Sequence, residues 1–112
     1  MGNYPDVLGD VFGALADPTR RDVVRRLGDG DASVSELAAD STMALPSFLK
    51  HVRVLERSGI VRTTKSGRVR MCSLQRERLA LVDDWLAIQR TVWAERTDRL
   101  EDLVTKIAQE ES

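Results

Sequence analysis

The stretch from Leu79 to Ala108 contains neither proline nor glycine, and it fills more than a quarter of a 112-residue chain. Its apolar residues recur at intervals of three and four, the spacing of one face of an α-helix. A helix of about 30 residues is about 45 Å long, more than a domain of this size can cover with its own side chains. We therefore expect part of the apolar face to be buried against another chain.

Shorter elements precede this stretch. The pair Asp17-Pro18 has the residue types of a helix N-cap and first turn, and Gly28 and Gly30 are typical of a helix end. The patterns predict helices at 7–16 and 18–27, a short strand at Ser33-Val34, a two-turn helix from Ser35, a helix at 45–58, strands at 60–65 and 68–74 joined by a turn at Ser66-Gly67, and the long helix at 79–108. The expected fold is mainly α with a small β-hairpin wing (α+β), a winged helix-turn-helix in a single domain over residues 1–112.

Positive charge is concentrated in one part of the chain. Residues 45–70 hold seven lysines and arginines against Glu56, a net charge of +6, which leaves −7 for the rest of a chain whose total is −1. The sequence pI of about 5.8 would alone argue against a nucleic-acid partner. The segregation instead predicts one surface that attracts a polyanion.

The helix pair from Ser35 to Ser58 has the spacing of a helix-turn-helix, with a basic outer face on its second helix. A helix fits the major groove of DNA, where Ser47, Lys50 and His51 can contact base edges, while Arg53 and Arg57 are placed for phosphates. For His51 the alternative is a buried, satisfied histidine, but its place on the basic face favours a DNA contact. The following hairpin is expected to contact the flanking groove through Arg62, Lys65, Arg68 and Arg70.

Several strings, in the right order, resemble the ArsR-type winged-helix regulators of bacteria over most of the chain. Leu15–Arg21 looks like that family's entry into its second helix, Val34–Ala38 like its third helix, and Lys50–Glu56 followed by Ser58–Val61 like its recognition helix and the start of its wing. The resemblance implies a repressor that occupies an operator as a homodimer, joined through the first and last helices (residues 1–16 and 79–108). The interface residues we expect are Leu8, Val11, Phe12, Val82, Trp85, Val92, Trp93 and Leu100.

The chain departs from the family pattern in two places. Leu49 stands where many members carry serine, which bears on base preference. Ala44-Leu45 precedes Pro46 where a capping Ser or Thr is expected, so the recognition helix is predicted to fray at its start. Many members also bind metals through paired cysteines or through His and Asp ligands on the last helix. This chain has one Cys and one His, so we expect no metal and no other cofactor.

The single cysteine and the two tryptophans can each be interpreted as structural residues or as functional ones. Cys72 is a small packed hydrophobic residue or, alternatively, a redox-sensing thiol. Trp85 and Trp93 belong to core or dimer packing rather than to a ligand site. One cysteine excludes an internal disulfide and agrees with a cytoplasmic location, and no apolar run is long enough to span a bilayer.

The absence of a recognisable nucleophile, phosphate loop or carboxylate pair argues against an enzyme. A winged-helix module that docks a protein partner through its long last helix is the alternative to a DNA-binding regulator. The operator, the target genes, the choice between repression and activation, and any small-molecule effector lie beyond what the sequence decides.

Overall fold

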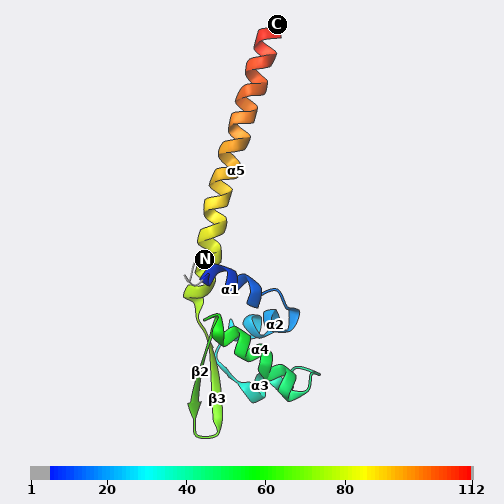
Figure 1. The fold of residues 1–112 in the computed structure, drawn as a ribbon, viewed down its shortest axis with the longest axis vertical. Helices are drawn as coiled ribbons and strands as arrows, with labels where there is room; N and C mark the ends of the chain where they lie inside the picture. Colours follow the sequence, from blue (N-terminus) through cyan, green and yellow to red (C-terminus); the bar gives the residue numbers. More distant parts are fainter. Residues whose placement is uncertain (1–5, 112) are drawn as a thin grey trace. The chain divides into compact units, whose positions relative to one another are not determined.

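The computed structural model describes residues 6–111 (Figure 1). The elements in this range follow the predicted order: α1 (Val7–Ala14), α2 (Pro18–Leu27), β1 (Ala32–Ser33), α3 (Val34–Ala39), α4 (Leu45–Arg57), β2 (Val61–Ser66), β3 (Val69–Leu74) and α5 (Arg76–Glu111). The predicted winged helix-turn-helix fold is confirmed, with α3 and α4 as the helix pair and the β2–β3 hairpin as the wing.

Short-range hydrogen bonds determine where two of the helices begin. The Asp17 carboxylate accepts from the backbone N–H of Arg20 at 3.0 Å, so it caps α2 as predicted. Ser33 and Glu36 form a reciprocal capping box, in which each side chain accepts from the other residue's backbone N–H. Because Ser33 is the cap, α3 starts at Val34, one residue before the predicted Ser35.

The three strands form an antiparallel sheet in the order β1-β3-β2. Ser66 pairs with Val69, so the hairpin turn consists of Gly67 and Arg68 rather than the predicted Ser66 and Gly67. Gly67 has a φ of +63°, a conformation that favours glycine and is common in two-residue hairpin turns. The turn lies at the free end of the hairpin (Figure 1).

The core of the winged-helix part draws on α1, α2, α4, the start of the wing and β3. Its largest fully buried side chains are Val11, Leu27, Phe48, Leu55, Ile60 and Cys72. The helical spacing that Leu45 shares with Phe48, Val52 and Leu55 predicts a buried side chain, but Leu45 is 53% exposed. It is the first residue of the helix, three residues before the first buried one, so the helical period alone misplaced it.

The entry into the wing is defined by the end of α4. Gly59 has a φ of +81°, and the backbone N–H of Ile60 donates to the carbonyl of Leu55 at 3.1 Å, which is the hydrogen bond of a Schellman motif. This turn directs the buried Ile60 into the core and starts β2 at Val61.

Helix α5 begins three residues before the predicted Leu79 and ends three residues after the predicted Ala108. The chain divides into two compact units within this helix, between Val82 and Asp83. Among the described residues, no helix combines the length and apolar character needed to cross a membrane.

Candidate nucleic-acid interface

Helix α4 has two opposite faces. Phe48, Val52 and Leu55 recur at four- and three-residue intervals and are buried in the core. Lys50, Arg53 and Arg57 recur at three- and four-residue intervals on the other side, and all three are exposed. Ser47 is also exposed, one turn before Lys50. The helix that follows the helix-turn-helix turn therefore presents a row of cations to its surroundings.

Within the described part of the chain, these cations form no ion pair with an acidic side chain. Among residues 6–111, the ion pairs link Arg25 with Asp22, Arg26 with Glu36, and His51 with Asp17. None of them involves a lysine or arginine of α4 or of the wing. Uncompensated positive charge on one stretch of surface attracts polyanions.

The register of the wing places two cations directly opposite each other. Lys65 on β2 pairs with Arg70 on β3, whereas Arg62 lies opposite Ser73. Side chains alternate between the two faces of a strand, so Arg62 lies on the other face of the hairpin from Lys65. The four predicted wing cations, Arg62, Lys65, Arg68 and Arg70, are all exposed, but they do not share one face.

A chain of hydrogen bonds connects α4 with the wing. The hydroxyl of Thr63 on β2 donates to the carboxylate of Glu56 on α4. The Arg70 guanidinium on β3 donates to the same hydroxyl oxygen at 3.2 Å. Helix α4 and both strands of the wing are thereby joined through one threonine.

His51 takes part in a second network, on the side of α4 that faces α2. Its Nδ1 lies 3.0 Å from a terminal nitrogen of Arg20 and 3.6 Å from a carboxylate oxygen of Asp17. The side chain is 21% exposed. The backbone N–H of Arg20 lowers the pKa of Asp17, and electrostatic interactions with His51 and the Arg20 guanidinium lower it further.

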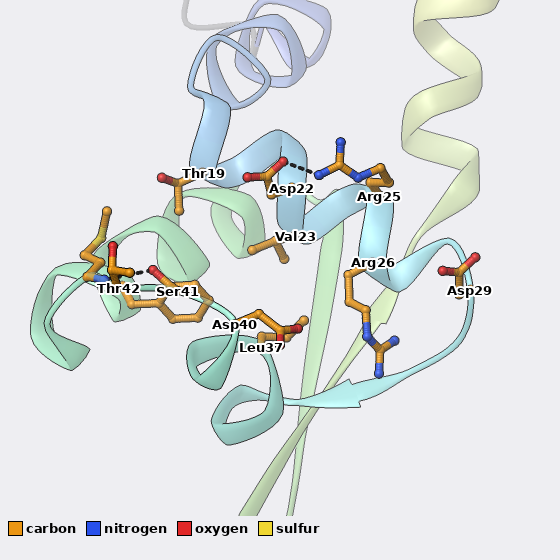
Figure 2. A pocket seen from close by; sticks show the side chains of 12 residues that line it. Thr19, Asp22, Val23, Arg25, Arg26, Asp29, Leu37, Asp40, Ser41 and Thr42 are labelled. Carbon is orange, nitrogen blue, oxygen red and sulfur yellow. Dashed lines mark hydrogen bonds and ion pairs between the residues drawn. The ribbon is translucent and has the colours of Figure 1, made fainter.

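A groove of about 570 Å³ lies between α2 on one side and α3 with the following turn on the other (Figure 2). Val23, Leu37 and Phe48 supply its apolar floor. Its arginines are already engaged: Arg25 contacts Asp22 at 2.5 Å, and Arg26 lies 4.0 Å from Glu36. This mixed surface thus differs from the uncompensated cations of α4 and the wing.

Comparison with known proteins identifies the family of this fold. Residues 15–64, which include α2, α3 and α4, match a family model described as a helix-turn-helix domain. The crystal structure of the ArsR family transcriptional regulator RHA00566 is 53% identical, covers 79% of this chain and 97% of its own, and superposes with a TM-score of 0.77. The chain belongs to the ArsR family of transcriptional regulators. The predicted resemblance is thus confirmed.

Other relatives of this ArsR-family chain agree. An ArsR-like transcriptional regulator from Rhodococcus sp. RHA1 is 28% identical, with a TM-score of 0.77 over 87% of this chain and 92% of its own. The regulator Rv2034 of Mycobacterium tuberculosis is 39% identical over 60% of this chain and 63% of its own length, so the match leaves over a third of Rv2034 uncovered. The transcriptional repressor SdpR of Bacillus subtilis is 27% identical over 70% of this chain and 88% of its own. Because these relatives are transcriptional regulators, the prediction that the chain is not an enzyme is confirmed.

The residues predicted for an ArsR-type dimer interface divide into two groups. Val11 is 0% exposed within its own chain, so the prediction that it contacts a partner is wrong. It belongs to the same buried core as Phe48 and Leu55 of α4, and the helical period alone did not distinguish the inner from the outer residues of α1. The other predicted residues keep some exposure: Leu8, Phe12, Val82, Trp85, Val92, Trp93 and Leu100.

Three residues beside the candidate nucleic-acid interface were not predicted as functional. They are Arg20, Asp17 in its contact with His51, and Thr63. Arg20 is 31 residues from His51 in the sequence, so no local pattern links them. Cys72 is fully buried, which favours the packed hydrophobic residue over the thiol sensor. Within the described range, no three His, Cys, Asp or Glu side chains come together as a metal site.

Proposed function

We propose that this chain represses transcription by binding double-stranded DNA sequence-specifically as a homodimer in the cytoplasm. The observation that carries the proposal is the exposed row of Lys50, Arg53 and Arg57 on α4, which has no ion pair among the described residues. A basic helix that follows a helix-turn-helix turn fits the major groove, where phosphates flank it on both sides.

The proposed contacts divide according to chemistry. Ser47, Lys50 and His51 lie toward the start of α4 and would contact base edges, with Lys50 donating to guanine acceptors. Arg53 and Arg57 lie further along and would bind phosphates. The wing would contact the flanking groove and its phosphates through Arg62, Lys65, Arg68 and Arg70.

The homodimer is supported by the sequence pattern of α5. Leu86, Trp93, Leu100 and Ile107 recur at intervals of seven, the repeat of helices that wind around a partner helix. Trp93, Leu100, Leu103 and Ile107 are each about half exposed in the single chain, and such an apolar row is unfavourable in water. The remaining interface residues we propose are Leu8, Phe12, Val82, Trp85 and Val92.

The repressor role is supported by the relative SdpR, which is a transcriptional repressor. A symmetric dimer would place two α4 helices in successive major grooves, about 34 Å apart, on a roughly palindromic operator. Such a dimer excludes polymerase where the operator overlaps a promoter.

The test is a gel shift with the DNA upstream of the chain's own gene. We expect a salt-sensitive complex in which Lys50→Ala relaxes base preference. Arg68→Ala should weaken all sequences alike and lower the slope of log affinity against log salt by about 0.9 per lost phosphate contact. Arg25→Ala is the matched control, because Arg25 is basic and exposed but already paired with Asp22 on α2. Binding that is absent at micromolar protein, or equal for all three variants, would refute the proposal.

A further inference from the structure

Arg20 connects the end of α1 with the recognition helix α4. Its Nε donates to the carbonyl of Ala14 at 2.6 Å, and one terminal nitrogen donates to the carbonyl of Gly13 at 3.2 Å. Its other terminal nitrogen lies 3.0 Å from Nδ1 of His51. One side chain of α2 therefore holds both neighbouring helices.

The chemistry of arginine decides which partner donates. A guanidinium carries donors alone and stays protonated in proteins. Nδ1 of His51 must then accept, so the proton of the neutral ring lies on Nε2. Asp17 favours the opposite arrangement, because a carboxylate accepts and would draw a proton to Nδ1. Its oxygen is 3.6 Å from that nitrogen, against 3.0 Å for Arg20, so the Arg20 contact dominates.

We propose that Arg20 is a positioning residue for DNA recognition, which holds His51 as the Nε2–H tautomer so that the ring offers a hydrogen-bond donor to the duplex. The inference rests on the proposed DNA binding. If Nε2 carries the proton, the group on DNA that contacts His51 must be a hydrogen-bond acceptor. The candidates are O6 or N7 of guanine, O4 of thymine, N7 of adenine and a phosphate oxygen.

The tautomer can be measured without DNA. His51 is the one histidine of the 112-residue sequence, so its two imidazole nitrogens are identified directly in ¹⁵N NMR spectra of the full chain. At about pH 8, where an ordinary imidazole is neutral, we expect Nδ1 to be unprotonated and Nε2 to carry the proton. Arg20→Met removes the donor while keeping an unbranched side chain of similar helix propensity. Asp17 then becomes the nearest polar group, and the proton should move to Nδ1.

Two further variants separate this role from a structural one. Arg20→Lys keeps a donor and should restore the Nε2–H form. Arg21→Ala is the matched control, because Arg21 donates to the carbonyl of Leu15 at 2.8 Å and so holds the same segment without contacting His51. Its ring spectrum should equal that of the unchanged protein. Circular dichroism confirms that each variant is folded.

In DNA binding, Arg20→Met should lose about tenfold in affinity and some base preference, the size of one base contact, while Arg20→Lys and Arg21→Ala should not. A proton on Nδ1 in the unchanged protein, or no tautomer shift in Arg20→Met, overturns the inference whether or not DNA binds. A tautomer shift with unaltered DNA affinity overturns the role in recognition. If the unchanged protein binds no DNA, the proposed function fails as well, and the NMR result then reports on Arg20 and His51 alone.

Discussion

Lys65 and Arg70 lie directly across from each other on the two strands of the wing, so two positive charges occupy one cross-strand pair. Like charges directly opposite each other are destabilising, whereas an opposite-charge pair in that arrangement contributes about 0.2–1 kcal/mol. The pair destabilises the free protein slightly and becomes favourable when a polyanion lies beside it.

Replacing Lys65 should therefore change stability and DNA binding in opposite directions. Lys65→Glu places a carboxylate opposite Arg70, and we expect the free energy of unfolding to rise by about 0.5 kcal/mol in urea titrations. DNA affinity should fall, with a salt slope smaller by about 0.9. Arg62→Glu is the control: it lies opposite Ser73 and should bring no gain in stability. A Lys65→Glu protein that is less stable, or that binds DNA unchanged, would contradict this explanation of the wing.

The apolar row of α5 gives a second prediction. Leu100→Asp should shift sedimentation from two copies toward one, because each copy loses the burial of one leucine, about 1.5–3 kcal/mol. Thr105→Asp introduces the same charge on the other side of the helix and should leave the dimer intact. Circular dichroism spectra of the two variants should show that both remain folded. Equal sedimentation of the two variants would exclude this row from the interface.

Acid should weaken the start of α2. The pKa of Asp17 is lowered in the folded chain, chiefly by the backbone N–H of Arg20. The stability it contributes is present above the unfolded pKa of about 3.9 and is lost as the pH falls through the lower folded value. Melting temperatures between about pH 6 and pH 2.5 should fall more steeply for the unchanged protein than for Asp17→Asn, which keeps a neutral cap. Parallel curves would show that this carboxylate is not linked to folding.

Cys72 should be chemically inert in the folded chain. It is fully buried on β3, and its burial raises the pKa of the thiol, so little thiolate is present near neutral pH. A thiol reagent such as dithionitrobenzoate should react at the rate at which the protein unfolds and faster when urea is added. Rapid reaction of the native protein would instead support the alternative hypothesis that Cys72 is a redox-sensing thiol.

Local signals explain which parts of the fold were predictable. The Asp17-Pro18 start of α2, the Gly59 end of α4 and the alternating cations of the wing depend on neighbours in sequence. The Ser33–Glu36 capping box has the same local character, and its serine-x-x-glutamate spacing was a usable signal that was missed.

Long-range packing explains what was missed at the site. His51 lies on α4 near the cations, but its surroundings are determined by Arg20 and Asp17 on α2. Val11 has the same helical spacing as Phe12 and Leu8, yet it is buried, because packing within the chain decides which side of α1 is covered. Periodicity identifies an apolar face without identifying what covers it.

The hydrogen bonds from Glu56 through Thr63 to Arg70 have one more consequence. Because helix α4 and the wing share this threonine, we expect their contributions to operator affinity in the proposed complex to be energetically coupled. The changes in binding free energy caused by substitutions in the two elements should not be additive. A base change in the part of the operator that one element contacts should also alter the contribution of the other element to affinity.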